Sequence, residues 1–519
     1  MTASYFDEKD EAAPEVLVAT TLKPNDNNGS VINNAIMSAY GVSYDSRFLA
    51  PPGQPYSSYA NFCRPAVVPG PGSGFCWPNA QGQTSTDFSL KADYDVTDKI
   101  HLKAIGAYSN FTGLSTNATD VSPLGFVRDL VFFDTTQYTG EVRVNGTSFA
   151  DKLDWVGGVF VLSSLSHLSG DIFSGVASVF TESDYFHTDS QSAFLHGDFK
   201  VTDRWSVSAG ARYSRGNKTD ALNHPQLFAD IIPFSVKESH VDWLASTDYR
   251  ITNDLMAYLT VSTGSRPPGI STVVQSKYQL SPFPAEELTA YEFGMKSEFL
   301  DHRLRINTDI FYSDYKSRLT SESAYECLGQ TPPPTPVLLS SLCPAGGFKP
   351  WTLTIGTPAT VRGFELEATA EPIDGLLLNL GAGYNHVKSG VDTLGQPGYV
   401  VSGNLPQPEW NVSGGIQDQI ALLGGNLTPR LDWVYESLQT FNPASANTAT
   451  TPIYNVPAHS IFNGRIAYAP GQSKWSIVVS GTNLLNKFYL YDKFTGPGFS
   501  IAGNAAPPRE WMVTLRHDF

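Results

Sequence analysis

The sequence predicts an all-β fold, namely a large antiparallel transmembrane β-barrel with short periplasmic turns and long extracellular loops. Three observations predict it: a repeated hairpin unit, an alternation of apolar and polar side chains, and a regular order of short turns and long connections. Charged residues make up only 16% of the 519 residues, against roughly 25% in soluble domains, and aromatic residues reach 12%.

The hairpin unit recurs without gaps. ADYDVTDKIHLKAIGAYS, which begins at Ala92, aligns on GDFKVTDRWSVSAGARYS, which begins at Gly197, and STDYRITNDLMAYLTVS from Ser246 repeats the pattern. A short polar pair marks each turn, as turns favour: Thr97-Asp98, Thr202-Asp203 and Thr252-Asn253. Each unit therefore predicts two strands joined by a tight turn.

Further short turns are expected at 300–303, 371–375, 423–426 and 469–473, and long connections at 317–358, 388–409 and 486–508. Between them the side chains alternate, so that Leu304, Ile306 and Ile310 oppose Arg305, Asn307 and Asp309. If Pro14 to Leu22 forms the incoming strand, about 18 strands result, each near the 9 to 11 residues of a tilted crossing. Aromatic residues recur at the expected strand ends: Tyr108, Tyr213, Tyr249, Tyr258, Tyr312, Trp410, Trp433 and Trp475.

The chain ends in a strand, EWMVTLRHDF at 510–519. One face of this strand is mainly apolar and carries Trp511, Val513, Leu515 and Phe519. We expect these residues to serve as a closure and assembly signal, with the strand closing the barrel against the first strand.

Charge and hydropathy exclude other classes. The net charge of -16 offers no basic stripe to neutralise phosphates, so nucleic acid is not an expected partner. No apolar run reaches the length of a transmembrane helix, and MTASYFDEKDEAAPEV at the start lacks the basic and apolar regions of a secretory signal.

The four cysteines form two local pairs, Cys63 with Cys76 and Cys327 with Cys343, each in a loop rich in Pro and Gly. Short separations and loop settings favour disulfides formed in an oxidising compartment. A zinc site is disfavoured because neither pair has a second pair or clustered histidines nearby, and unpaired loop thiols remain the alternative.

An ordered series of motifs resembles a known family, the TonB-dependent outer-membrane receptors. The resemblance extends from about Thr86 to Phe519 and rests on the series as a whole rather than on any one motif. The motifs are QYTGEVRVNGTSFADKLDWVGGVFVLSS from Gln137, GSRPPGI at 264–270, LTAYEFGMKSEFLDHRLRINTDIFYSDYKS from Leu288, VRGFELEATA at 361–370, SGTNLLNKFYLYD at 480–492 and PREWMVTLRHDF at 508–519.

The resemblance implies a 22-stranded barrel with a plugged lumen in the outer membrane of a Gram-negative bacterium. It divides the chain into an N-terminal remnant at 1–85, with a strand and a long outer loop, and a barrel at 86–519. A plug domain and its TonB-binding motif are not visible, so the chain is expected to be truncated and to lack energised transport on its own. The implied partners are membrane lipid, the barrel assembly machinery, TonB through the missing plug, and a small ligand such as a ferric siderophore.

For ligand contact, the topology places Arg266, Tyr278, Tyr325 and Trp351 on outer loops, where aromatics and an Arg suit flat or anionic ligands. Glu365 and Glu367 share a strand face, but polar neighbours favour a solvated inner wall over catalytic carboxylates. Phosphate loops, zinc-protease motifs and serine-hydrolase elbows do not occur, so we expect no cofactor, no metal and no enzyme activity.

Two alternatives remain. A passive porin of 16 to 18 strands would need neither a plug nor TonB. A surface enzyme or adhesin on a barrel would need a convergent nucleophile and base, which the sequence does not show.

Overall fold

A computed structural model describes residues 1–11, 15–20, 37–38, 40–63, 74, 76–125, 127–174, 178–270, 282–327, 348–390, 407–441, 454–471, 474–495 and 500–518. Of these, residues 173–174, 178–180, 322–327, 348–352 and 495 are described by their backbone alone.

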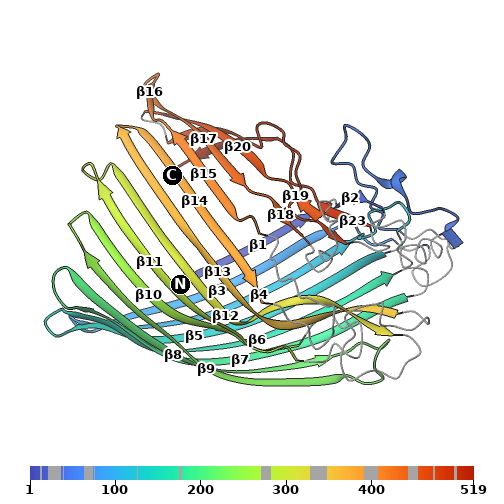
Figure 1. Ribbon diagram of the computed structural model, residues 1–519, viewed down its shortest axis with the longest axis horizontal. Helices are drawn as coiled ribbons and strands as arrows, with labels where there is room; N and C mark the ends of the chain where they lie inside the picture. The colour runs from blue at the N-terminus through green and yellow to red at the C-terminus, as the bar shows by residue number, and fades with distance from the viewer. Residues whose placement is uncertain are drawn as a thin grey trace.

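One antiparallel sheet of 19 strands forms a curved wall (Figure 1). β15 and β16 both pair with β17 and form a single interrupted crossing, so the wall has 18 crossings. The predicted all-β antiparallel fold and the strand number are therefore confirmed. The wall strands are β1 (Thr2–Asp10), β3 (Gln81–Thr97), β4 (Ile100–Asn117), β5 (Val127–Ser148), β6 (Leu153–Ser174), β7 (Ser178–Lys200), β8 (Trp205–Leu222), β9 (Ile232–Arg250), β10 (Leu255–Arg266), β11 (Glu286–Phe299), β12 (Leu304–Cys327), β13 (Phe348–Ile373), β14 (Leu376–Ser389), β15 (Trp410–Gln417), β16 (Ile420–Leu422), β17 (Gly425–Glu436), β20 (His459–Pro470), β21 (Trp475–Thr482) and β24 (Glu510–His517).

The short turns lie where the sequence predicts them, and the repeated threonines hold three of them. The Thr97 hydroxyl accepts a hydrogen bond from the Lys99 amide at 3.2 Å, and the Thr252 hydroxyl accepts one from the Asp254 amide at 3.2 Å. The Thr202 hydroxyl accepts from the amides of both Arg204 and Trp205. In each turn, the threonine hydroxyl thus accepts hydrogen bonds from backbone amides that no longer pair with the neighbouring strand.

The two faces of the wall differ as the alternation requires. Large apolar side chains are exposed on the outer face: Val241, Trp243, Leu259, Tyr291, Phe293, Ile310 and Tyr312. On the inner face Arg430 bonds to both Asp432 and Asn379. Gly415 lies between them, and a Cβ there would come within 2.4 Å of the Asn379 side-chain oxygen, so only glycine leaves room for this network.

One expectation about the wall's edges is wrong. The first wall strand is Thr2–Asp10, not Pro14 to Leu22, because β1 pairs with β3 whereas β2 (Glu15–Ala19) pairs with β23 (Ile501–Asn504) outside the wall. The final strand pairs with β21 along its described length. Its closure against the first strand stays a prediction.

The expected long connection at 317–358 is also wrong in extent. β12 and β13 remain paired up to Cys327 and Phe348, well beyond the expected strand ends. Leu353, Ile355 and Thr357 are buried and alternate with less buried neighbours, so the strand pattern continues into the region assigned to a loop. Glycine and proline at 356 and 358 concealed this alternation.

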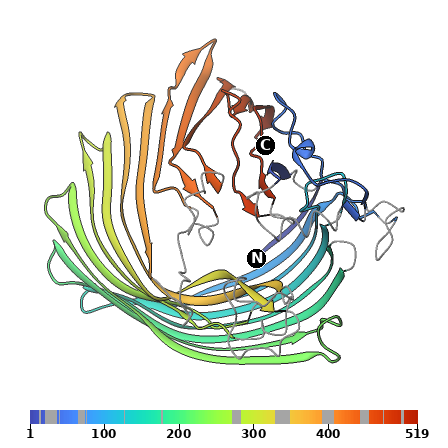
Figure 2. The ribbon, with the colours of Figure 1, turned by 45° about the vertical axis from the view of Figure 1, so that its right-hand side comes forward.

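The compact core of the described residues lies beside one end of the wall, in a region that we call the outer cap (residues 15–20, 40–63, 118–125, 127, 488–495 and 500–506). Here β2, β23 and β22 (Phe494–Thr495) form a small sheet, and η1 (Ser46–Phe48) packs nearby. β18 (Gln439–Thr440) pairs with β19 (Asn455–Val456) at the same end of the wall. Seven buried residues form the main cluster of the cap: Leu17, Tyr44, Phe48, Val121, Leu124, Val127 and Ala502. The cap therefore brings the N-terminal and C-terminal parts of the chain together (Figures 1 and 2).

Helices contribute little to this architecture. Within the described residues, no helix is long and apolar enough to cross a bilayer.

A disulfide joins Cys63 to Cys76 at the edge of the outer cap. Asn61 fixes the same segment, because its side-chain amide donates to the Pro123 carbonyl at 2.8 Å and its oxygen accepts from the Cys63 amide. The second expected pair lies outside the described residues, since the structure describes only the backbone of Cys327 and nothing of Cys343.

Replacing both Cys63 and Cys76 by Ser should loosen this part of the cap. A closed loop of this size restricts the unfolded chain by about 3 kcal/mol, which the double variant loses. Limited proteolysis in detergent should then cleave between residues 57 and 80 faster than in the wild type, while the heat-modifiable migration of the barrel stays unchanged. Equal cleavage rates would contradict the prediction.

The outer cap also contains a buried carboxyl group. Burial, and then the nearby carboxylates of Asp129, Asp492 and Asp120, raise the pKa of Glu15 to about 7. One Glu15 carboxylate oxygen is buried and has no hydrogen-bond partner among the described residues. A protonated carboxyl group fits this environment better than a carboxylate.

We expect the cap to be more stable at pH 5 than at pH 8. Because the folded pKa of Glu15 is raised above the unfolded value, the folded state binds the extra proton, and stability falls as the pH rises from about 4.5 to 7. Amide exchange of residues 15–19 and 501–504 in micelles should accelerate over that range beyond the intrinsic rate. Glu15→Gln should remove the pH dependence, and a variant that keeps it would contradict the assignment.

Candidate ligand-binding site at the outer mouth

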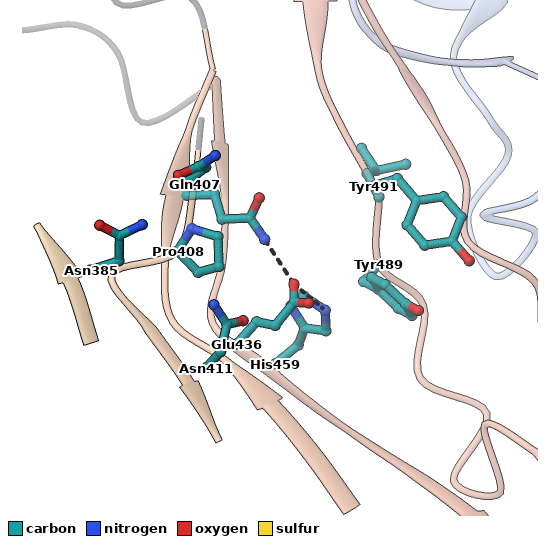
Figure 3. Close-up of a pocket in the computed structure, with 10 residues that line it drawn as sticks. Asn385, Gln407, Pro408, Asn411, Glu436, His459, Tyr489 and Tyr491 are labelled. Atoms are coloured by element: carbon teal, nitrogen blue, oxygen red, sulfur yellow. Dashed lines mark hydrogen bonds and ion pairs between the residues drawn. The ribbon is translucent and has the colours of Figure 1, made fainter. Parts of the chain in front are cut away.

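A cavity of about 550 Å³ lies at the wall ends from which the long connections start, between the wall and the outer cap (Figure 3). It is bounded by the ends of β14, β15, β17 and β20 and by the chain after β21. Polar and aromatic side chains dominate its lining: Asn385, Gln407, Pro408, Asn411, Glu436, Gln439, His459, Tyr489, Leu490 and Tyr491.

Strand register brings the polar part of this lining together. Asn411 of β15 lies directly opposite Glu436 of β17, and Glu436 lies opposite His459 of β20. Directly opposed residues in antiparallel strands point to the same face, and Asp432, which shares the parity of Glu436, belongs to the inner network. Three residues from distant parts of the sequence thus form one row on the inner face.

Glu436 is the charged centre of the row. The Gln439 side chain donates to its carboxylate at 2.9 Å, and the His459 Nε2 atom lies 3.7 Å from the same oxygen. His459 Nδ1 lies 3.2 Å from the Pro457 carbonyl, which accepts the hydrogen, so Nε2 is the nitrogen that faces the cavity. A neutral His459 accepts a hydrogen bond through Nε2, and a protonated one pairs with Glu436.

Aromatic rings form the opposite wall of the cavity. Tyr489 stacks on the His459 ring with centroids 4.3 Å apart, and Tyr491 meets Tyr489 edge to face at 5.6 Å. Burial, and next the neighbouring Tyr491, raise the pKa of Tyr489 to about 12, so its phenol stays neutral and able to donate. Figure 3 shows Glu436 and His459 on one side and Tyr489 and Tyr491 on the other.

Asn483 holds the chain that carries these tyrosines. It is buried with φ +46°, and its side-chain amide donates to the carbonyls of Lys487 and Pro507 while its oxygen accepts from the Lys487 amide. Its own backbone amide donates to Asn463 on β20 at 2.9 Å. Asparagine tolerates the left-handed conformation and offers both a donor and an acceptor, which explains its use here.

A second cavity, of about 520 Å³, shares His459, Tyr489 and Leu490 with the first and extends into the outer cap. Its other walls are mainly apolar and include Val16, Val18 and Phe488, with two lysines at Lys487 and Lys493. The pair of cavities combines hydrogen-bonding groups, stacked rings and an apolar recess. Such a combination fits a flat, partly aromatic ligand with polar substituents.

Below the mouth, the inner wall is acidic. Glu365 and Glu367 line a cavity of about 230 Å³ with Asn411 and Ser413, in agreement with the expected inner-wall position rather than with a catalytic pair. Tyr258 also points inward, where its hydroxyl donates to Glu292 at 2.5 Å. Among the aromatic residues expected at strand ends, Tyr258 therefore does not face the lipid, because its position in the alternation places it on the face opposite to the exposed Leu259.

The residues expected to contact ligand are not gathered at this cavity. Arg266 ends β10 with an exposed side chain, 4.0 Å from Glu286, and does not line it. Tyr325 and Trp351 lie in β12 and β13, opposite Pro350 and Ala324, with only their backbones described, and Tyr278 lies outside the described residues. Of the closure residues, Trp511, Val513 and Leu515 are exposed on β24, whereas Phe519 lies outside the described residues.

Sequence reasoning did not select the residues that the mouth cavity brings together. Tyr489 and Tyr491 enter the sequence analysis only as part of the motif SGTNLLNKFYLYD, and Asn411 and His459 do not enter it. By parity, Glu436 falls on the same strand face as Arg430 and Asp432. Its meeting with His459 depends on register, which the long connection between their strands leaves open.

Comparison with known proteins identifies the family. A family model described as TonB dependent receptor-like, beta-barrel, matches residues 20–484. The chain belongs to this family. Its members are receptors and transporters of the outer membrane of Gram-negative bacteria rather than enzymes. The resemblance inferred from the motifs is therefore confirmed.

Individual relatives are more distant. The chain is 24% identical over 180 residues to the pesticin receptor of Yersinia pestis, which covers 34% of this chain and 26% of the receptor. Among solved structures it is similar to the ferric yersiniabactin uptake receptor FyuA of Yersinia pestis, with a TM-score of 0.66, 17% identity and coverage of 85% of this chain and 62% of that one. The siderophore receptor PiuA of Acinetobacter baumannii gives a TM-score of 0.65, 16% identity and coverage of 84% and 64%. The chain thus spans less than two thirds of either solved receptor.

Asn483→Ala should disorder the segment from Lys487 to Tyr491 without opening the wall. The variant loses three side-chain hydrogen bonds at a buried site, each worth about 1 kcal/mol net. Amide exchange of residues 487–491 should rise strongly, whereas exchange in β20 and β21 should change little. Asn426→Ala, which changes an exposed asparagine beside a short turn, is the matched control, and equal effects of the two variants would contradict the role of Asn483.

Proposed function

We propose that this TonB-dependent receptor-like protein forms the wall and outer mouth of an outer-membrane receptor that takes up a scarce ligand, a ferric siderophore. The row of Asn411, Glu436 and His459 opposite stacked Tyr489 carries the proposal. This arrangement places hydrogen-bonding groups and aromatic faces together at the end of the wall where the long loops begin.

The chemistry of the mouth fits the ligand class. Siderophores carry many oxygen donors and often planar rings, which amide side chains and stacked aromatics can bind. The adjoining apolar recess would accept a ring or an alkyl arm, and its two lysines would offset ligand charge. Relatives support the class, because FyuA, PiuA and BauA are described as receptors for ferric yersiniabactin, a siderophore and ferric preacinetobactin.

In the proposed uptake cycle, different parts of the receptor capture the ligand, line its passage and supply the energy. The outer loops and mouth residues of this chain would capture the ligand, and its polar inner wall would line the passage. Energy would come from TonB, through a plug domain of the family type, and membrane lipid and the barrel assembly machinery would be further partners. Arg266, Tyr325 and Trp351, which lie toward the outer ends of β10, β12 and β13, and Tyr278 remain proposed ligand contacts.

Binding assays with the purified protein in micelles should test the mouth. Loss of a stacked ring costs about 1.4 kcal/mol, or tenfold in affinity, so Tyr489→Ala and His459→Ala should each weaken binding of the cognate ferric siderophore by about tenfold. The quenching of tryptophan fluorescence across a panel of ferric siderophores provides the measurement. His302→Ala, at a short turn far from the mouth, is the control.

Two results would separate this proposal from a passive porin. A receptor binds one ligand class saturably, and iron-limited growth of a strain that depends on the full-length gene should require that ligand and TonB. If Tyr489→Ala and His459→Ala both bind the ferric siderophore with unchanged affinity, the proposed site is wrong. Ligand-independent conductance in planar bilayers, with no saturable binding, would favour the porin.

A further inference from the structure

A second polar cluster lies away from the mouth cavity, where β7 and β8 end beside the long connection to β9. Glu182 and Asp184 are alternate residues of β7 and share one face, while His224 follows the end of β8 by two residues. Tyr185, which follows Asp184 and points to the opposite face, is exposed, whereas both acids are buried, so the cluster lies on the inner side of the wall.

Local hydrogen bonds fix His224 against this face. The Ser183 amide donates to the Asn223 carbonyl at 3.1 Å, and the Asn223 amide donates to one Asp184 oxygen at 2.9 Å. The other Asp184 oxygen lies 2.9 Å from His224 Nε2. The His224 carbonyl then accepts from the amides of Leu227 and Phe228, which turns the chain immediately after the cluster.

The geometry is that of a cation site. One carboxylate oxygen from each of Glu182 and Asp184 and one nitrogen of His224 all lie within 4.8 Å of one another. Two ligand atoms at about 2.1 Å from a tetrahedral zinc ion lie about 3.4 Å apart, so Asp184 and His224, whose atoms are 2.9 Å apart, would need to separate by only about 0.5 Å to hold one. Nitrogen with two carboxylates is a ligand set typical of zinc and similar ions, unlike the all-oxygen sets of calcium.

Burial makes the cluster costly without a cation. The side chains of Asp184 and His224 are fully inaccessible, and Glu182 is 4% exposed. One Glu182 carboxylate oxygen is buried with no hydrogen-bond partner among the described residues. Buried carboxylates need a cationic or hydrogen-bonding partner.

The neighbours add negative charge and exclude water. Asp220 on β8, opposite Phe186, has a fully buried side chain whose oxygens accept no hydrogen bond in the described part of the chain. Its nearest cation is Lys218, 3.8 Å away. Leu222 and Ile270 form a buried apolar cluster beside it with five partly buried side chains: Phe186, Leu227, Phe228, Ile232 and Phe234.

We propose that Glu182, Asp184 and His224 bind one divalent transition-metal ion of the zinc class, which fastens the connection between β8 and β9 to the outer end of β7. The ion would offset the charge of the buried acids, and it would bind the Glu182 carboxylate, one oxygen of which has no hydrogen-bond partner among the described residues. The site is separate from the mouth cavity and shares no residue with it, so its role is to brace an outer loop rather than to hold the transported ligand.

The test uses the full-length protein in detergent micelles, stripped with EDTA and dialysed against Zn²⁺. The wild type should retain about one zinc per chain, and bound Co²⁺ should show the visible absorption of a site with a nitrogen ligand. Zinc should slow proteolysis between residues 223 and 231. Glu182→Gln and His224→Gln should each weaken zinc binding by about 100-fold or more.

His240→Gln is the matched control. His240 also faces a carboxylate, with Nε2 3.1 Å from Asp242, but this pair is partly exposed and has no third ligand among the described residues. The His240→Gln variant should therefore bind zinc as the wild type does. If stripped wild-type protein binds no more zinc than Glu182→Gln, the proposal is wrong, and a hydrogen bond between His224 and Asp184 beside a protonated Glu182 explains the cluster. Equal loss of zinc in the control variant would likewise overturn it.

Discussion

The pairing of backbone groups between neighbouring strands is the constraint on which this structure depends. A bilayer interior offers no water to peptide N–H and C=O groups, so every crossing must satisfy them in the sheet. Long, continuous registers such as those of β5 with β6 and β6 with β7 meet this requirement. The side chains of each strand can then face two environments, with apolar rings toward the lipid outside and charged networks toward the water inside.

This division explains where the molecule can have specific sites. The outer face exposes apolar side chains, and the wall itself has little buried core. The tightly packed residues lie instead in the outer cap and beside the wall ends, where chain segments cross the inner space. Polar groups there are removed from water, which makes their partners matter energetically. The mouth cavity and the acidic cluster at Glu182 both arise in this zone.

The two clusters suit different kinds of ligand. The mouth row is open and its charged centre, Glu436, already has Gln439 and His459 nearby, so it suits a ligand that comes and goes. The cluster of Glu182, Asp184 and His224 is closed, with fully buried ligand atoms, and suits a resident ion. Burial thus separates a proposed transport site from a proposed structural one.

The strands, their short turns and the two faces follow from the sequence alone, because alternation and turn chemistry act between residues close in the chain. The Thr97, Thr202 and Thr252 turns are examples. The sequence did not identify Thr2–Asp10 as the first wall strand, nor the meeting of Asn411, Glu436 and His459. Those depend on which strand edge a distant segment joins and in which register, and long connections leave both open. They become definite in the folded molecule, since the pairing of backbone groups across the whole wall fixes register at once for every strand.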